Sequence, residues 1–389
     1  MEPLNVALAL LGGLLLALNL SSEFVTDRVP VLSQPLLATA FGAAVGPAGL
    51  GLLVLSAWGD PIAILEHVAR VTVGFAVVGI ALRVPVQYVR RRAAALAVVL
   101  GPGMVSMWLA SSALVYVLLG VPERTALLLG AIVTPTDPVI ANTIVTGSLA
   151  ESQIPDRLRR FLSTEAGAND GLAYPFVFLA IFALSHPLEG ALSRWLVDAA
   201  LVGVGGAVAL GAFGGTVVGV LEREAERRGA LLGTSDVLAA FVAGMAYNTF
   251  ANPRDEALES EVQDAIKRLL TIPAFVVFGA ALPWAEWRTL GAAGVALGIA
   301  IVLLRRLPAW LAIAPVVAPL RTRDDALFVG WFGPIGVAAL LYATISVRET
   351  GTEIGWIVGS LVIAASIVAH GATATPLTNA YGRASRSSE

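Results

Sequence analysis

The sequence contains no cysteine and only three histidines among its 389 residues. These absences exclude disulfides, thiolate metal sites and cysteine nucleophiles, and they leave too few imidazoles for a histidine-rich metal site. Charge is also scarce, because Asp, Glu, Lys and Arg together make up 14% of the chain and the net charge is −3. A weakly negative chain indicates no affinity for nucleic acid or other polyanions. We expect neither a nucleic-acid partner nor a bound cofactor.

Apolar side chains, in contrast, make up 57% of the chain, and its mean hydropathy is +0.80. Soluble domains usually contain about 45–50% apolar and about 25% charged residues. A soluble fold of this composition would expose large apolar patches, which are rare. The composition therefore predicts an all-α protein that crosses a lipid bilayer many times. No segment between spans is long enough for a soluble domain, so residues 1–389 are expected to form one membrane domain.

Twelve apolar stretches approach the length of about 20 residues that a membrane-spanning helix needs. They are Leu4–Leu20, Pro35–Leu55, Ile62–Leu82, Ala93–Leu119, Ala126–Val145, Phe161–Leu184, Trp195–Leu221, Leu231–Phe250, Leu269–Trp284, Gly291–Pro315, Ala326–Val347 and Glu353–Thr375. Arginine-rich loops set the orientation, and they place the loop with Arg90 to Arg92 in the cytoplasm. Strict alternation then puts Arg321 and Arg323 outside. Either one crossing is missing, giving thirteen spans, or one segment is re-entrant.

Ionisable side chains within apolar spans cost roughly 2.5–3.5 kcal/mol each, so each is a candidate functional residue. In the stretch Thr134–Pro138, two prolines, Pro135 and Pro138, remove backbone donors and disfavour helical geometry at the residues before them. We therefore predict a broken helix whose carbonyl groups and half-helix ends can bind a cation beside Thr136 and Asp137. The alternative is a proline kink in which Asp137 only caps the second half-helix.

A second polar cluster lies near the start of the span Phe161–Leu184. Glu165 and Asn169 are four residues apart and share a helical face, whereas Asp170 is rotated by about 100° from Asn169. Small neighbouring residues allow another backbone to approach closely. The alternative is a helix N-terminus at the cytoplasmic rim, where the helix dipole favours acidic residues. The apolar and aromatic run after Asp170 argues against that alternative for this residue.

Two adjacent arginines, Arg305 and Arg306, interrupt the apolar run from Gly291 to Pro315. At least one guanidinium must be buried and therefore needs a carboxylate partner, for which Glu165 is the best candidate. The alternative is that both arginines extend to a nearby interface. His370 is another polar residue in an apolar run, and a buried histidine bonded to backbone is a better interpretation of it than a proton relay.

Two carboxylates and an asparagine at a broken helix would form a compact oxygen site suited to Na⁺ or Li⁺. Because burial penalises the charged form of a carboxylate, an aspartate there binds either a proton or a cation. One aspartate beside a neutral asparagine then exchanges one proton per cation. We therefore expect an electroneutral secondary transporter and not an enzyme, with the choice among Na⁺, Li⁺ and K⁺ left open.

Two other functions use the same residues. Two membrane aspartates could form the dyad of an intramembrane protease, although the Gly-x-Gly-Asp motif of those enzymes is absent around Asp137 and Asp170. A passive cation channel would need a continuous wet path, whereas these aspartates suggest one deep site.

At these residues the sequence resembles the monovalent cation:proton antiporters of the NhaP and sodium–proton exchanger type. The matching motifs follow the family order and are Thr134–Pro138, Glu165–Asp170, Leu304–Pro308, Gly330–Val337 and His370–Leu377. The resemblance implies a homodimer with an inverted-repeat core in which two unwound helices cross. Residues of about 93–185 and 291–375 would lie on the core side, and about 1–92 and 190–290 on the dimer or scaffold side.

The resemblance also implies roles for individual residues. Asp170 would be the main cation and proton carrier, with Asp137 and Thr136 helping to line the site. Glu165 would help to hold Asn169 and would pair with a buried arginine. Arg306 is favoured as that arginine because of its spacing to Pro308, with Arg305 as the alternative.

Two departures from the family pattern stand out. Ala166 has no oxygen where many relatives carry a serine as a further ion ligand, so water or a backbone carbonyl would have to substitute. The region Glu222–Thr234 is short beside relatives with thirteen spans. We expect a protein of the plasma membrane of a prokaryote that serves sodium transport and pH homeostasis.

Overall fold

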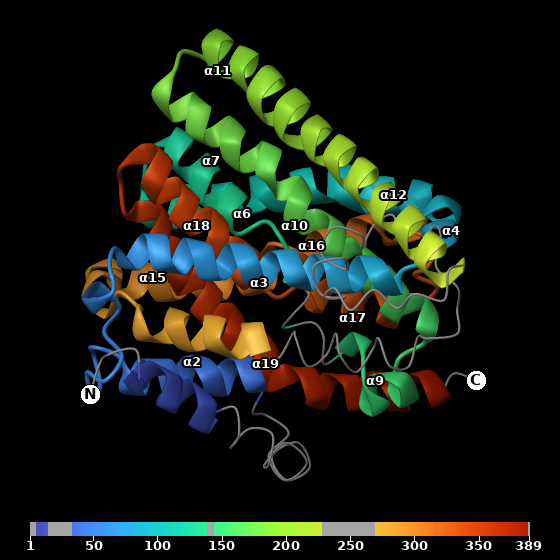
Figure 1. Ribbon diagram of the computed structural model, residues 1–389, viewed down its shortest axis with the longest axis horizontal. Helices are drawn as coiled ribbons and strands as arrows, with labels where there is room; N and C mark the ends of the chain where they lie inside the picture. Colours follow the sequence, from blue (N-terminus) through green and yellow to red (C-terminus); the bar gives the residue numbers. More distant parts are fainter. Residues whose placement is uncertain (1–4, 15–32, 138–139, 141–143, 228–268, 388–389) are drawn as a thin grey trace.

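The computed structural model describes residues 5–14, 33–137, 140, 144–227 and 269–387. Within these residues nearly every segment is helical and none is a strand. Many of the helices run roughly along the longest axis of the molecule (Figure 1). Six helical segments in the described part of the chain are long and apolar enough to cross a bilayer: Pro61–Arg83, Ala93–Leu119, Asp156–Ser185, Leu188–Val217, Trp284–Val316 and Ile354–Arg386. The prediction of an all-α, polytopic membrane protein is confirmed.

Helices occupy every expected span except Leu231–Phe250, which lies outside the described residues. The first half of the chain forms Asn5–Leu14, α2 (Gln34–Val45), α3 (Pro61–Arg83), α4 (Val86–Arg91), α5 (Ala93–Val98), a π-helical turn (Val99–Gly103), α6 (Met104–Leu119), α7 (Glu123–Ile132), α9 (Ser148–Gln153) and α10 (Asp156–Ser185). The second half forms α11 (Leu188–Arg194), a π-helix (Trp195–Gly205), α12 (Gly206–Arg227), Leu269–Ala280, α15 (Trp284–Leu304), α16 (Leu307–Ile313), α17 (Arg323–Trp331), α18 (Val337–Thr350) and α19 (Ile354–Ser387).

Two expected spans are shorter or less regular than predicted. The span Pro35–Leu55 is helical only to Val45, because Gly46 takes an extended conformation ahead of Pro47. The span Gly291–Pro315 is interrupted after Leu304, where the chain turns both adjacent arginines inward before α16 begins. Pro308 favours this break because it has no N–H to donate to the carbonyl of the preceding turn.

Local sequence explains where several helices begin. Asp60 caps α3, since its carboxylate oxygens accept hydrogen bonds from Ile62 N (3.1 Å) and Ala63 N (3.3 Å). Thr322 and Asp325 form a capping box at the start of α17, in which each side chain accepts from the other's backbone N–H. These caps fix the helix ends that lie at the two rims of the molecule.

Two helices are broken in the middle of the molecule. α7 ends at Ile132, residues 133–137 are not helical, and residue 140 is helical again. α17 ends at Trp331, residues 332–336 are not helical, and α18 starts at Val337. The first break lies where the two prolines predicted it, although Pro138 itself lies outside the described residues. The second break corrects the expectation that Ala326–Val347 is one continuous helix.

Contacts among Arg157, Arg321 and Asp325 bring the start of α10 and the start of α17 together at one end of the molecule. The guanidinium of Arg157, at the start of α10, contacts Asp325 at the start of α17 (2.8 Å), and the hydroxyl of Tyr88 on α4 lies 3.5 Å from the carbonyl oxygen of Arg157. Arg321 N donates to the same Asp325 carboxylate (2.7 Å). Arg157 and Arg321 therefore lie at the same end of the molecule, so strict alternation of the twelve stretches fails between them, as a missing crossing or a re-entrant segment would explain.

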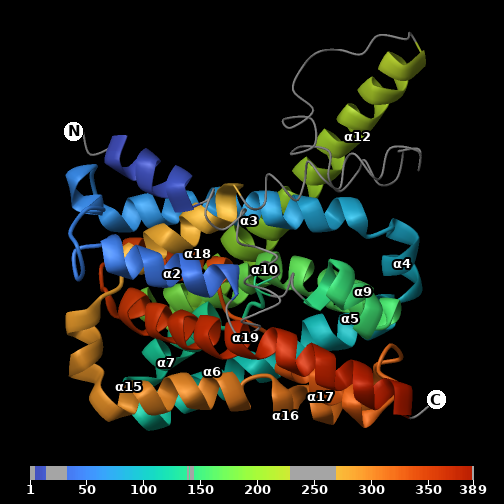
Figure 2. The same ribbon diagram turned by 90° about the horizontal axis from the view of Figure 1, so that it is seen from below.

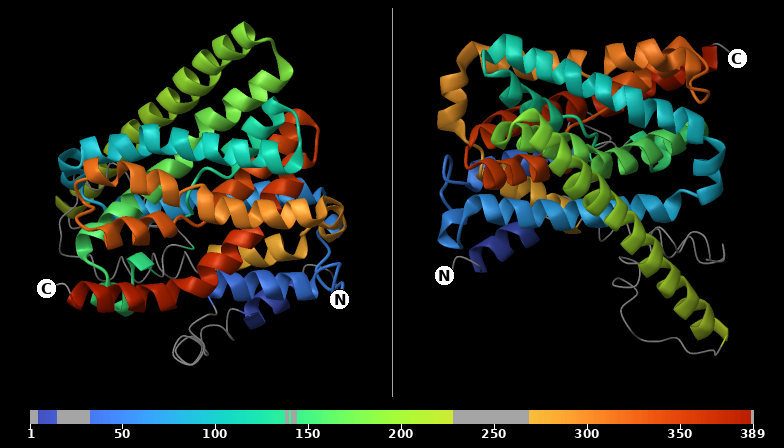
Figure 3. Two further views of the ribbon diagram at one scale, coloured as in Figure 1. Left: turned by 180° about the vertical axis from the view of Figure 1, so that it is seen from behind. Right: turned by 90° about the horizontal axis from the view of Figure 1, so that it is seen from above.

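α10 lies inside the helical assembly, in contact with α3, α7, α17 and α18. α11, the π-helix and α12 lie along its outer side, and α12 projects away from the remaining helices (Figures 2 and 3). Only 6% of the apolar window in Leu188–Val217 is buried, against 33% or more in the other five candidate spans. This outer helix therefore has an apolar face of which the described residues bury little.

Candidate functional site

The two unwound segments, residues 133–137 and 332–336, meet at what we call the crossing. Asp137 N donates a hydrogen bond to Pro334 O (2.7 Å). The Asp137 carboxylate accepts hydrogen bonds from Val337 N through Oδ2 and from Ile140 N through Oδ1 (3.2 Å). One carboxylate thus stands at the N-terminal, positive ends of both second half-helices. The capping alternative describes these contacts of Asp137, but the residue caps two half-helices and not one.

Arg305 occupies the opposite ends of the broken helices. It is only 2% exposed, and its guanidinium donates to four backbone carbonyls at the C-terminal, negative ends of α7 and α17. These are Val133 O (2.6 Å), Thr134 O (2.8 Å), Pro135 O (3.1 Å) and Gly333 O. The alternative in which both arginines extend to an interface is therefore wrong. Arg305 compensates carbonyl groups that the two breaks leave without helical partners.

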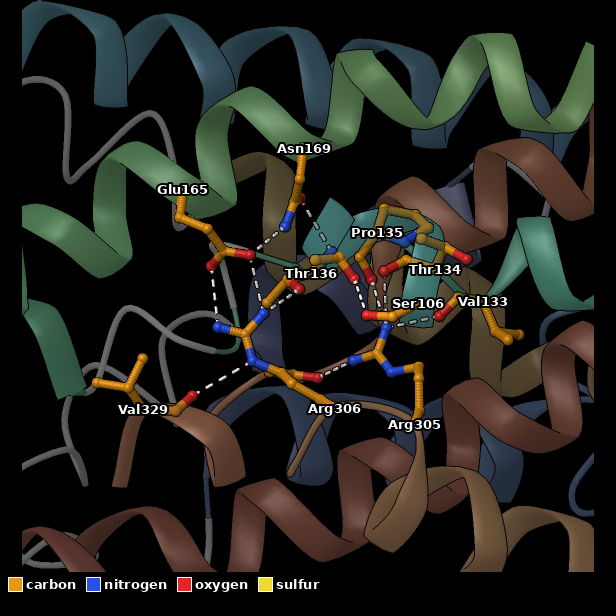
Figure 4. A network of polar contacts seen from close by, with 12 residues as sticks. Ser106, Val133, Thr134, Pro135, Thr136, Glu165, Asn169, Arg305, Arg306 and Val329 are labelled. Carbon is orange, nitrogen blue, oxygen red and sulfur yellow. Dashed lines mark hydrogen bonds and ion pairs between the residues drawn. The ribbon is translucent and has the colours of Figure 1, made fainter. Parts of the chain in front are cut away.

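Arg306 points to another side of the crossing and pairs with Glu165 (Figure 4). Its two terminal nitrogens lie 2.8 and 3.0 Å from the two carboxylate oxygens, and both residues are at most 2% exposed. The same guanidinium donates to Thr136 Oγ1 (3.0 Å) and lies over the ring of Trp310, 4.3 Å from its centroid. Arg306, and not Arg305, is the partner of Glu165 in the structure.

Asn169 connects α10 to the first unwound segment. Its side-chain nitrogen donates to Glu165 Oε1 (2.8 Å), and its oxygen accepts from Thr136 N (3.0 Å). Both groups of the amide are therefore committed, and Figure 4 shows the side chains of Glu165 and Asn169 pointing from α10 toward the crossing. These contacts fix the rotation of α10 about its axis, and with it the direction in which the next residue, Asp170, projects.

Asp170 is the one acidic residue here with an unused oxygen among the described residues. It is 3% exposed, and its Oδ1 is buried without a hydrogen-bond partner. The carboxylates of Asp137 and Glu165 lie close enough to act on it electrostatically. Its backbone is anchored, because the hydroxyl of Tyr342 on α18 donates to Asp170 O (2.6 Å). The rim alternative for this residue is wrong, since it lies deep in the molecule.

The described residues contain no group of three or more histidine, aspartate or glutamate side chains that could hold a metal ion. A cation at the crossing would therefore be bound by one or two carboxylates together with neutral oxygens. Ala166, one residue after Glu165, is 2% exposed and offers no side-chain oxygen. Backbone carbonyls or water would have to complete the ligand set, as the sequence indicates.

Several residues at the crossing were not singled out from the sequence. Tyr342 anchors Asp170, Ser366 accepts from Ile335 N (2.7 Å), and Gly336 lies so close to Asp137 that a Cβ there would overlap its carboxylate. The run Gly333-Pro334-Ile335-Gly336 carries a break signal for the second unwound segment, but a weaker one than Pro135 and Pro138, because it has a single proline. Nothing in the sequence marks Tyr342 or Ser366.

The sequence is similar to a known protein family and to several of its members. A family model described as "Sodium/hydrogen exchanger, transmembrane" matches residues 6–231 and 228–380. Na(+)/H(+) antiporter 2 of Zygosaccharomyces rouxii is 30% identical over 88% of this chain and 46% of its own length. The Na(+)/H(+) antiporter of Saccharomyces cerevisiae is 29% identical over 89% of this chain and 38% of its own length. A Na(+)/H(+) antiporter of Schizosaccharomyces pombe is 27% identical over 95% and 89% of the two chains.

The chain thus spans about half the length, or less, of the first two of these relatives. All three are fungal, so they give no support to the expected prokaryotic membrane. The fold matches the sodium proton antiporter MjNhaP1 from Methanocaldococcus jannaschii at pH 8, with a TM-score of 0.71, 16% identity and coverage of 97% and 99% of the two chains. The family model covers most of the sequence, and the chain belongs to the sodium/hydrogen exchanger family.

Proposed function

We propose that this protein exchanges Na⁺ or Li⁺ for H⁺ across a membrane, one cation per proton, and that both bind at Asp170. The antiporter names of the fungal relatives support the reaction. The observation that carries the site is the buried Asp170 carboxylate beside the crossing, with one oxygen that no described residue engages. K⁺ is a third candidate for the exchanged cation.

Competition follows from the burial of that carboxylate. A buried carboxylate without a compensating charge is costly, and either a proton or a bound cation removes the cost. The two cannot occupy the same oxygen together. If only the neutralised site moves between the two sides, each cation that leaves in one direction must be matched by a proton in the other. The proposal is therefore an exchanger and not a uniporter.

The charges buried around the crossing favour a one-to-one exchange. The buried ionisable groups around the crossing are the carboxylates of Asp137, Glu165 and Asp170 and the guanidiniums of Arg305 and Arg306. Three negative and two positive groups leave one uncompensated negative charge among these described residues. One proton or one monovalent cation neutralises it, whereas two would leave an excess positive charge in a low-dielectric interior.

The neighbouring oxygens would assist Asp170 in holding a dehydrated cation. Thr136 and Asp137 are the proposed lining residues, with Asp137 acting mainly through its charge because both of its carboxylate oxygens already accept backbone N–H groups. Ala166 supplies nothing, so water or a backbone carbonyl takes the place of a further side-chain ligand.

We also propose that the protein forms a homodimer, as the family resemblance implies. The exposed apolar face of α11, the π-helix and α12 supports this, because only 6% of its apolar window is buried in the part of the chain that the structure describes. The division into a core side (about 93–185 and 291–375) and a scaffold side (about 1–92 and 190–290) is part of the same proposal.

The test is transport by purified protein in liposomes with an imposed pH gradient and an internal pH dye. Addition of Na⁺ or Li⁺ should dissipate the gradient, and Asp170→Asn should abolish the response. Asp324→Asn is the matched control, because Asp324 is an exposed aspartate away from the crossing. Unchanged exchange in Asp170→Asn would remove this residue from the mechanism.

Membrane voltage tests the stoichiometry. Clamping the potential with K⁺ and valinomycin at different values should leave the exchange rate unchanged if one cation replaces one proton. A rate that rises with voltage would refute electroneutral exchange. Na⁺ flux that follows voltage and ignores the pH gradient would instead indicate a channel, and cleavage of a transmembrane peptide would indicate a protease.

A further inference from the structure

The break between α17 and α18 leaves backbone groups that need partners, because a bilayer interior offers no water to satisfy them. Two side chains of α19 meet two of these groups. Ser366 and His370 lie one turn apart on α19 and are 0% and 2% exposed. Ser366 Oγ accepts a hydrogen bond from Ile335 N at 2.7 Å, and His370 Nε2 lies 3.0 Å from Trp331 O.

Three other polar backbone groups of this unwound segment bond to partners on other elements or next to the segment. Gly333 N donates to Trp331 O (2.8 Å), Gly333 O accepts from Arg305, and Pro334 O accepts from Asp137 N (2.7 Å). Arg305 and Asp137 therefore hold the middle of the segment, facing the crossing. The Ser366 and His370 pair holds the start and the later part of the segment from α19.

One neutral tautomer of His370 satisfies every group in this arrangement. Because the Ser366 oxygen accepts from Ile335 N, its own hydrogen is free to donate to His370 Nδ1, which lies 3.1 Å away. Nε2 then carries the ring hydrogen and donates it to Trp331 O. Nδ1 also lies 3.0 Å from Ser366 O, which can only accept, so that contact would be a hydrogen bond only if Nδ1 carried a hydrogen.

We infer that Ser366 and His370 are positioning residues that set the course of the unwound segment 332–336 and, through it, the contacts of Asp137. Val337, whose N–H donates to the Asp137 carboxylate, lies two residues after Ile335. Pro334, whose carbonyl accepts from Asp137 N, lies one residue before Ile335. A shift of Ile335 therefore moves the groups that orient the Asp137 carboxylate. The inference rests on the proposed function, and neither residue is assigned a contact with the transported ion.

The histidine can be tested with two variants that each keep half of its bonding. The terminal nitrogen of a glutamine can take the place of Nε2, so His370→Gln keeps a donor for Trp331 O. Asparagine is shorter, and His370→Asn can bond to Ser366 but does not reach Trp331. Ser366→Ala removes the acceptor for Ile335 N. Ser346→Ala is the matched control, because Ser346 is also buried but its hydroxyl donates only to Ala343 O of its own helix.

The experiment measures exchange in liposomes and deuterium uptake of the peptide containing Ile335 in the same full-length protein. We expect Ser366→Ala and His370→Asn to raise the apparent KM for the cation roughly two- to tenfold, the effect of one lost hydrogen bond, and to speed deuterium uptake at Ile335. His370→Gln should change both less than His370→Asn, and Ser346→Ala should match the unmodified protein. If Ser366→Ala does not reach the membrane, the two histidine variants carry the test.

Unchanged KM and unchanged deuterium uptake in Ser366→Ala and His370→Asn would overturn the inference. Equal loss of exchange in His370→Gln and His370→Asn, with uptake at Ile335 unchanged, would also overturn it and would indicate a proton relay. Absence of exchange in the unmodified protein would instead refute the proposed function. Deuterium uptake would still decide whether the pair holds the segment.

Discussion

The buried pair of Glu165 and Arg306 offers a quantitative test of how the crossing is held together. We consider Glu165→Gln, which keeps the size of the side chain and its oxygen for Asn169 but removes the negative charge. Arg306, which is 2% exposed, bonds to both oxygens of Glu165 at 2.8 and 3.0 Å, and the substitution would leave it buried without a bonded carboxylate. Removing one partner of a buried ion pair typically costs about 3–5 kcal/mol.

A second substitution, at the partner arginine, should relieve that cost. Arg306→Met keeps an apolar stem against Trp310 and removes the positive charge. The double variant Glu165→Gln with Arg306→Met removes both members of the pair and leaves the net charge of the crossing unchanged, and replacing both members of a buried pair by neutral groups is often close to neutral. We therefore expect the two single changes to be strongly non-additive, with a coupling free energy of about 3 kcal/mol.

The measurement is the free energy of unfolding in mixed micelles, from titration with a denaturing detergent, for each single variant and the double variant. Arg305→Met combined with Glu165→Gln is the control cycle, because Arg305 bonds to backbone carbonyls and has no hydrogen bond to Glu165 in the structure. Its coupling should be much smaller. A larger coupling for Arg305 than for Arg306, or additive effects for Arg306, would refute this account of the two arginines.

Three further changes test other parts of the structure. Gly336→Ala should disrupt the crossing and abolish exchange at normal expression, since its Cβ would overlap the Asp137 carboxylate; wild-type rates would contradict this. Tyr342→Phe removes the hydrogen bond to Asp170 O and should cost about 0.5–1.5 kcal/mol of unfolding free energy, with no loss counting against the contact. Burial alone would raise the pKa of Asp325 at the rim, but hydrogen bonds from an arginine, a tyrosine and a backbone N–H lower this pKa below 3.8. Its stabilising contribution is therefore present above pH 3.8 and lost as pH falls through the lowered value. Asp325→Asn should flatten that acid dependence of the unfolding midpoint, and an unchanged slope would refute the assignment.

The sequence was informative where a residue type conflicts with its surroundings. Charges within apolar runs marked Asp170, Glu165 and the two arginines, and closely spaced prolines marked the break after α7, because each of these is costly in a membrane helix unless it is compensated. The same reasoning stopped at the second break. There the signal is a single proline between glycines, which membrane helices often tolerate without unwinding.

The sequence could not predict which of Arg305 and Arg306 bonds to the Glu165 carboxylate and which to backbone carbonyls. Adjacent residues point in directions that differ by about 100° on a helix, but here α15 ends at Leu304 and both arginines lie between it and α16. Which guanidinium meets the carboxylate therefore depends on the tertiary position of α10. Tyr342 and Ser366 were missed for a related reason, since a hydroxyl group in an apolar helix is ordinary until its partner on another helix is known.

The four carbonyl bonds of Arg305 have a mechanical consequence. They come from both unwound segments, so pulling those segments apart would strip a charged group of its ligands in a place without solvent to replace them. The two broken helices must therefore travel together as one stiff body. Any motion that opens the aspartate first to one side of the bilayer and then to the other has to take place at a sliding surface outside that body.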